Sequence, residues 1–230
     1  MLRFDEVDIR VGDFALHADF ELSKGRKAAI IGPSGSGKST LLGALGGFVD
    51  IAKGRVIYDG DDITHAAPGA RPIAMLFQDN NLFPHLTLRQ NVALGLQSNL
   101  RLGPEEEKRV ATAIDRVDLA GMETRRPSAL SGGQQSRAAL ARVLVQDKPL
   151  VVLDEPFAAL GPALRHEMLD LVSALVAEID ATLLMVTHAP EDVTRIADDV
   201  IYVDDGRANA PEPAAALMAN PPPALKAYLG

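Results

Sequence analysis

The sequence predicts an α/β fold built on a mostly parallel β-sheet. Three runs support this prediction: Lys27–Ile31, Leu150–Leu153 and Thr182–Val186. Each run is apolar without alternation, as expected of strands that are covered on both faces. Turn residues and then a helical pattern follow such runs, which is typical of α/β proteins. With 47% hydrophobic residues in 230, the chain has ample material for a buried core, which excludes disordered and fibrous classes.

Other parts of the chain depart from this pattern. The first two dozen residues alternate loosely around Gly12-Asp13, which predicts an antiparallel hairpin. A helical pattern runs from about Leu86 to Val145, with Glu105–Glu107 early in one helix, where the helix dipole favours acids. Residues 210–223 are rich in Ala and Pro, which predicts a loose tail with a short helix. We therefore expect a single domain over 1–230, with a core of about 1–85 and 147–210, a helical insert of about 86–146 and a tail of 211–230.

Composition restricts the location and the partners of the chain. Its longest apolar runs fall far short of the roughly 20 residues that cross a bilayer. The N-terminus Met1–Glu6 lacks the basic and then apolar pattern of a signal peptide, so we expect a cytoplasmic chain. A net charge of −8 argues against nucleic acid as a partner and leaves room only for a local basic patch. The absence of cysteine excludes disulfides and thiolate metal sites.

A glycine-rich segment has the pattern of a phosphate-binding loop. It lies between an apolar strand and a helix expected to begin near Ser39, a context that disfavours a simple glycine-rich turn. Glycines let backbone N–H groups converge on phosphates, Lys38 can reach the terminal phosphates, and the Ser39 hydroxyl can ligate Mg²⁺. The predicted nucleotide-binding residues are Gly32, Pro33, Ser34, Gly35, Ser36, Gly37, Lys38, Ser39 and Thr40.

Two carboxylates follow the strand-like run at 150–153. Asp154 should lie at the carboxyl edge of the sheet, beside the phosphate loop. Asp154 can then hold Mg²⁺, and Glu155 can orient or activate water. A strand followed by Asp-Glu is common and mostly structural, so this prediction depends on the loop.

A second anion site is predicted where the helical run Ser136–Val145 begins. Ser131, Gly132, Gly133 and Gln134 gather a hydroxyl and glycine amides at a positive helix end. Such a segment is usually only a helix start. Here, two phosphate-type sites separated by a helical insert suggest that they serve different nucleotides or different subunits.

Two further polar residues end strand-like runs. His188 follows the run at 182–187, on the same sheet edge as Asp154, and Gln78 follows Ile73–Phe77. Either residue alone would be interpreted as structural. The remaining histidines lack metal-ligand spacing and are interpreted as surface or loop residues: His17, His65, His85 and His166.

Taken in order, these elements resemble the nucleotide-binding subunit of an ABC transporter over essentially the whole chain. The resemblance implies a P-loop NTPase with a RecA-like core that binds ATP and Mg²⁺. It implies that Gln78 touches Mg²⁺ or water and couples to the membrane subunits. It also implies that Ser131 and Gly133 close over the γ-phosphate of ATP on a partner subunit, while His188 contacts that phosphate from its own side.

The resemblance further implies a set of partners. Two ATP molecules would be sandwiched in a head-to-tail homodimer, and hydrolysis would release it. The dimer would sit peripherally on the cytoplasmic face of the inner membrane, on two transmembrane permease subunits that receive solute from a periplasmic binding protein. Import is favoured because no transmembrane domain is fused. The membrane contact is expected around Asn80–Leu86, although Leu82, Phe83 and Leu86 could equally be core residues.

A narrower resemblance concerns the solute. The stretch Met75–Phe83 with His85–Thr87, and the later Leu183–His188, are similar to the ATP-binding subunits of bacterial thiamine importers. Other small solutes, such as iron, a polyamine or an anion, remain alternatives. Alternatives of another class are a soluble ABC ATPase acting on nucleic acid or ribosomes, and a subunit that binds nucleotide without useful hydrolysis.

Two departures from the family pattern stand out. The loop after the catalytic glutamate usually carries an Asp that bridges to the other subunit, and Gly161 stands in its place. An aromatic residue of the N-terminal hairpin usually stacks on adenine. Phe14 is the candidate for this role here, and Val11 is the alternative occupant of the expected position.

Overall fold

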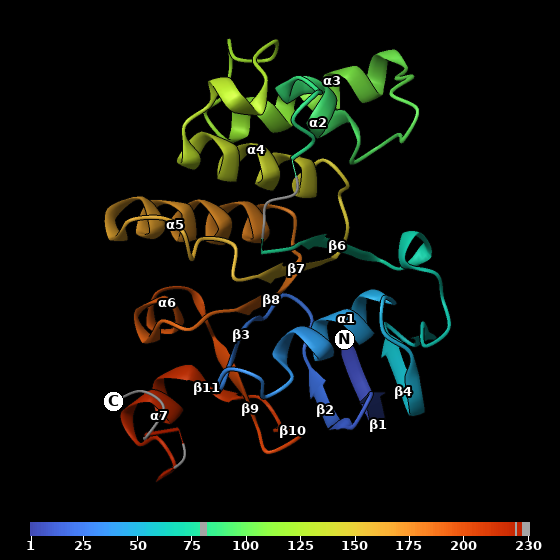
Figure 1. Cartoon of the computed structure of the whole chain (residues 1–230), viewed down its shortest axis with the longest axis vertical. Helices are drawn as coiled ribbons and strands as arrows, with labels where there is room; N and C mark the ends of the chain where they lie inside the picture. Colours follow the sequence, from blue (N-terminus) through green and yellow to red (C-terminus); the bar gives the residue numbers. More distant parts are fainter. Residues whose placement is uncertain (79–81, 224, 227–230) are drawn as a thin grey trace.

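The described residues of the computed structural model, 1–78, 82–223 and 225–226, form an eleven-stranded sheet (Figure 1). Its parallel part has the order β9 (Asp199–Asp204), β3 (Lys27–Ile31), β8 (Thr182–Val186), β7 (Leu150–Asp154) and β6 (Ile73–Leu76). All three strands predicted from apolar runs are confirmed.

Burial explains why these strands do not alternate in sequence. Leu183 and Met185 of β8 belong to a hydrophobic cluster on one face of the sheet, and Leu184 and Val186 belong to a cluster on the other. Because both faces are covered, each successive side chain is apolar.

The predicted N-terminal hairpin is also confirmed. β1 (Leu2–Val11) pairs antiparallel with β2 (Phe14–Leu22) and, on its other side, with β4 (Ile51–Tyr58). The short β5 (Asp61–Asp62) continues this part of the sheet beyond β4. β10 (Arg207–Ala208) pairs with both β2 and β9 and so joins the antiparallel and parallel parts.

Among the described residues, three α-helices are inserted between β6 and β7. α2 (Leu88–Ala93), α3 (Pro104–Arg116) and α4 (Gly132–Leu144) gather at one end of the molecule, at the top of Figure 1. The three glutamates at 105–107 occupy the first turn of α3, as predicted. α5 (Pro162–Glu178) lies between this layer and the parallel strands. One hydrophobic cluster includes residues of the insert, α5 and the strands, and the proposed division into core and insert stays a prediction.

The C-terminal segment is predicted to be a loose tail with a short helix. The short helix is confirmed, but the described part of the segment packs against the sheet and is not loose. β11 (Glu212–Pro213) pairs with β9, and α7 (Ala214–Ala219) follows it. Leu217 and Leu225 are buried with Val193 of α6 (Pro190–Ile196) and Tyr202 of β9. The spacing of the few apolar side chains, rather than the Ala- and Pro-rich composition, decides this packing. No helix among residues 1–78, 82–223 and 225–226 is long and apolar enough to span a bilayer.

A buried arginine anchors α1 (Lys38–Gly46), the helix that follows the phosphate loop. Arg71 is 2% exposed, and its guanidinium donates hydrogen bonds to the carbonyls of Ala44 and Leu45 at the end of α1. It also donates to the carbonyls of Thr64 and Ala66. Burial lowers the pKa of Arg71, but the four carbonyl contacts satisfy the buried charge.

Candidate functional site

The predicted phosphate loop connects β3 to α1, and its backbone requires glycine. Gly32 and Gly37 have φ values of 153° and 106°. A Cβ on Gly32 would lie 2.0 Å from the Val203 carbonyl oxygen, and one on Gly37 would lie 2.7 Å from Phe14 Cζ. Neither position accepts a side chain, so the sequence permits the tight turn that brings the loop onto the sheet.

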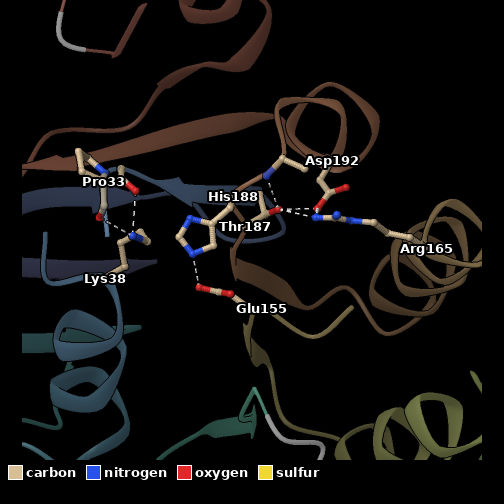
Figure 2. A network of polar contacts seen from close by, with 9 residues as sticks. Pro33, Lys38, Glu155, Arg165, Thr187, His188 and Asp192 are labelled. Carbon is tan, nitrogen blue, oxygen red and sulfur yellow. Dashed lines mark hydrogen bonds and ion pairs between the residues drawn. The ribbon is translucent and has the colours of Figure 1, made fainter. Parts of the chain in front are cut away.

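Lys38, the first residue of α1, turns back onto the loop (Figure 2). Its Nζ donates hydrogen bonds of 2.8 Å to the carbonyls of Gly32 and Pro33. Lys38 is 6% exposed, and burial lowers its pKa, while the nearby Glu155 and Asp154 carboxylates oppose this shift. The two carbonyls therefore hold the ammonium at the loop.

A cavity of about 520 Å³ opens over the loop. It brings together predicted residues from the hairpin, the loop and α1, and the ends of β6, β7 and β8. Its lining consists of Val11, Phe14, Ser34, Gly35, Gly37, Lys38, Ser39, Thr40, Gln78, Glu155 and His188. Both adenine candidates are included. The Phe14 ring packs against Gly37, whereas Val11 is 49% exposed.

Asp154 ends β7 next to Ser39. Burial raises the pKa of its carboxyl, a hydrogen bond with Ser39 opposes this shift, and the Glu155 carboxylate adds to it. Asp154 Oδ1 is buried and has no hydrogen-bond partner. A buried carboxylate oxygen without a partner requires a physical explanation, and a bound cation would supply one.

The residues present fit Mg²⁺. Asp154, Ser39 and Gln78 would offer a carboxylate, a hydroxyl and an amide oxygen, the hard ligands that Mg²⁺ prefers. Within the described part of the chain, no group of three or more His, Cys, Asp or Glu residues could hold a metal by itself.

Glu155 and His188 face each other across the ends of β7 and β8 (Figure 2). His188 Nε2 forms a short contact with Glu155 Oε1. Glu155 has a φ of 46°, and its N–H donates to the Val186 carbonyl at 3.2 Å. A non-glycine residue with positive φ is uncommon, and such backbone strain is concentrated at functional sites.

The predicted second anion site lies apart from this cavity. Ser131 caps α4: its Oγ accepts from the Gln134 N–H at 3.3 Å, and Gln134 Oε1 accepts from the Ser131 N–H at 2.9 Å. Ser131 and Gly132 are exposed, while Gly133 packs against Leu164 of α5. None of these residues lines the cavity over the phosphate loop, and α4 and α1 are well separated in Figure 1.

Residues 16–158 match the family model for the ABC transporter. The chain belongs to the ABC transporter family. The expected fold class and the family resemblance are therefore confirmed.

Full-length relatives sharpen the comparison. The chain is 57% identical to the thiamine import ATP-binding protein ThiQ of Cereibacter sphaeroides and 56% identical to that of Ruegeria sp., covering all of both proteins in each case. Among solved structures, the ADP conformation of MJ1267, an ATP-binding cassette of an ABC transporter, has a TM-score of 0.89 at 25% identity, covering 100% of this chain and 98% of that one. A dimeric post-hydrolysis state of the cassette MJ0796 bound to ADP and Pi has a TM-score of 0.78 at 29% identity. The match covers 93% of this chain and 99% of that one.

Sequence reasoning missed several polar residues around the site. Arg71 holds the far end of α1, and Arg165 and Asp192 lie beside His188. No motif marks them, and Arg71 and Arg165 each bind a partner more than 20 residues away in the sequence. Part of the expected membrane contact, Asn80 and Asn81, lies outside the described residues.

Proposed function

We propose that this chain is the ATP-binding and hydrolysing subunit of an ABC importer, and that the solute is thiamine. The convergence of the phosphate loop, Gln78, Glu155 and His188 on one cavity carries the ATPase assignment. Full-length identity of 56–57% with two proteins named for thiamine import supports the solute assignment.

In this proposal the loop amides and Lys38 hold the terminal phosphates of ATP. Lys38 would exchange its bonds to the Gly32 and Pro33 carbonyls for phosphate oxygens with little movement, because its side chain already lies in the loop. Ser39, Gln78 and Asp154 are the proposed Mg²⁺ ligands. When bound, this ion would neutralise negative charge on the phosphates.

Glu155 is proposed to receive a proton of the attacking water. The water oxygen then bonds to the γ-phosphorus as the bond to the β–γ bridging oxygen breaks, which yields ADP and inorganic phosphate. A His188 that donates from Nε2 orients Glu155 through their contact and lies within the same cavity as the phosphates. This arrangement is one of positioning and charge stabilisation, as phosphoryl transfer requires.

We propose that Ser131, Gly132, Gly133 and Gln134 serve the ATP of a second copy of the chain. The exposure of Ser131 and Gly132, and the separation of all four residues from the cavity of their own subunit, support this assignment. The Ser131 hydroxyl accepts one hydrogen bond within the cap and can still donate its proton to a phosphate. Two ATP molecules would then lie between two copies, with Phe14 or Val11 beside each adenine.

The permease is proposed to dock on an aromatic groove next to Gln78. The groove consists of two neighbouring cavities of about 230 and 550 Å³, which share Met75, Phe77 and Gln146. Phe48 and Phe83 extend it, and they are 58% and 45% exposed, so Phe83 is not the core residue of the alternative interpretation. Exposed aromatic side chains are typical interface anchors. The chain would thereby sit on the cytoplasmic face of the inner membrane and meet the periplasmic binding protein only through the permease.

A conservative substitution tests the ATPase assignment. Glu155→Gln should keep ATP binding but lower kcat by about 10²–10⁴-fold, the usual contribution of general-base assistance. An ATP-bound dimer should then accumulate, which sedimentation with ATP and Mg²⁺ would detect. Glu191→Gln, at an exposed position of α6, is the control and should behave as wild type. Unchanged turnover in Glu155→Gln would falsify the assignment.

The solute is tested separately in reconstituted vesicles with the permease and the binding protein. Thiamine should stimulate ATP hydrolysis, and iron, polyamines and inorganic anions should not. Stimulation by one of those solutes in place of thiamine would replace the solute assignment and leave the ATPase assignment intact.

A further inference from the structure

A polar network of three residues lies beside His188, on the side away from Lys38 (Figure 2). Arg165 of α5 donates from Nη2 to Asp192 Oδ2 at 2.6 Å and to Thr187 Oγ1 at 3.3 Å. The Thr187 hydroxyl also contacts Asp192 Oδ2. The network therefore joins α5, α6 and the end of β8 at one point.

Two residues of this network are buried, Arg165 is partly exposed, and not every polar atom is satisfied. Thr187 and Asp192 are 2% and 3% exposed. Asp192 Oδ1 and Arg165 Nε are nevertheless buried without a hydrogen-bond partner. Burying polar atoms without partners lowers the stability of the fold, and replacing a buried ion pair by apolar side chains often leaves a protein equally stable. Stability alone therefore does not explain this network. Both residues line a cavity of about 240 Å³ whose wall includes Glu155 and His188.

The network holds the backbone on both sides of His188. Thr187 Oγ1 accepts a hydrogen bond from the Ala189 N–H at 3.2 Å. The Thr187 N–H donates at 3.3 Å to the carbonyl of Ile30 in β3, the strand that leads into the phosphate loop. The orientation of the imidazole toward Glu155 thus depends on Thr187, whose hydroxyl is held by Arg165 and Asp192.

Arg165 also belongs to the segment that follows Glu155. Its N–H donates to the Gly161 carbonyl at 2.9 Å, so it lies one turn into α5. No polar side chain stands between Glu155 and Arg165, because residues 156–164 read Pro-Phe-Ala-Ala-Leu-Gly-Pro-Ala-Leu. Contacts therefore form a closed ring from Glu155 along the chain to Arg165, then through Thr187 to His188 and back to Glu155.

We propose that Arg165 is a positioning residue for ATP hydrolysis, which orients His188 toward Glu155 by way of Asp192 and Thr187. Gly161 has no side chain that could transmit a movement of the segment 156–161. Such a movement therefore reaches His188 through this ring of contacts. The inference rests on the proposed roles of Glu155 and His188 in hydrolysis.

Steady-state ATPase assays of the full chain test the proposal. Arg165→Met should lower kcat by about 10- to 100-fold, the size of effect expected when reacting groups are displaced by a fraction of their contact distance. KM for ATP should not change, because the phosphate loop is untouched. The matched control is Arg195→Met. Arg195 forms an exposed bidentate pair with Asp170, which joins the same two helices away from His188, and its loss should leave kcat unchanged.

A double variant separates positioning from stability. Arg165→Met leaves a buried carboxylate unpaired and lowers Tm, whereas Arg165→Met with Asp192→Leu removes both charges and should recover Tm. The proposal requires kcat to stay low in the double variant, and recovery of kcat along with Tm would overturn it. Wild-type kcat in Arg165→Met would also overturn it. An inactive wild-type chain would instead contradict the proposed function.

Coupling to His188 gives a further readout. In a His188→Ala background, measured under single-turnover conditions, adding Arg165→Met should lower the rate no further, because both substitutions disturb the same group. Additive losses would show that Arg165 acts elsewhere.

Discussion

Burial of the Asp154 carboxyl destabilises the nucleotide-free protein at neutral pH. Burial raises its pKa above the ordinary value of 3.8. Between 3.8 and the raised value, the folded chain holds a proton that the unfolded chain has lost, so the free energy of unfolding falls as pH rises through this window. Below the ordinary value both states are protonated and the penalty disappears.

Asp154→Asn should therefore raise Tm at neutral pH in the absence of nucleotide and Mg²⁺, and this gain should fade as the pH approaches 4. Thermal melts across pH, in a chelator, would measure it. Asp62→Asn is the control with the opposite sign, because hydrogen bonds from Thr64 lower the pKa of Asp62. A folded Asp154→Asn protein with a lower Tm at neutral pH would contradict this account. The same variant should bind ATP more weakly in the presence of Mg²⁺.

The place of a single residue was predictable from sequence where its position next to a strand or loop determines it, without contacts from other elements. Asp154 and His188 adjoin apolar strands, Lys38 begins the helix after the loop that follows one, and the ends of parallel strands meet at one edge of a sheet. Arg71 and Arg165 were not predictable, because their carbonyl and carboxylate partners come from other elements. A lone arginine in a sequence does not reveal that it is buried.

At the level of elements, the start of α5 decides what Gly161 contributes. Gly161 caps the helix with φ −66° and ψ 157°, an ordinary extended conformation. A Cβ there would meet nothing within 4 Å. The backbone at position 161 therefore does not require glycine, and an Asp would fit there without strain.

Gly161→Asp should act on both the helix and the dimer. As a cap it should stabilise the chain by a few tenths of a kcal/mol relative to Gly. A charge-assisted hydrogen bond across the dimer should add roughly 1.5–3 kcal/mol for each site. Sedimentation with ATP and Mg²⁺, in a Glu155→Gln background, would measure the tighter association.

Gly161→Asn is the control for capping, because it caps as well as Asp but carries no charge. Only the Asp variant should tighten the ATP-dependent dimer. Equal or weaker dimerisation of a folded Gly161→Asp protein would mean that this position does not limit association.

Strands and helices were predictable to different degrees. β3, β7 and β8 were found because layers on both faces of the sheet require continuous apolar runs. In the C-terminal segment the short helix was predicted but its packing was missed, because α7 is anchored by only a few side chains, among them Ala214 and Leu217. Composition describes an average and cannot indicate such spacing.

At the scale of the whole molecule, the proposed function depends on surfaces that a single chain leaves uncovered. Phe83→Ser should spare the fold and the basal ATPase of the isolated subunit, because the ring is 45% exposed. It should weaken association with the permease by about 2 kcal/mol, the threshold of an interface hot spot, which is roughly a 30-fold loss of affinity. Co-purification and vesicle transport assays would measure both effects.

Phe48→Ser should also reduce transport. The rings of Phe48 and Phe77 meet edge to face in the same groove, with their centroids 5.4 Å apart. A Phe83→Ser chain that unfolds, or one that transports normally, would contradict the docking proposal. Sequence alone left this residue undecided between core and interface, because an apolar side chain after a strand suits both.

The position of Lys38 also has a consequence for the handling of the protein at the bench. Its ammonium is already held at the loop by two carbonyls, 2.8 Å from each, beside the start of α1. A site so prepared also attracts small oxyanions, which helix N-termini readily bind. Phosphate or sulfate in a buffer would therefore occupy the loop and compete with ATP. Nucleotide affinities measured in such buffers would be too weak, and chloride salts are the better choice.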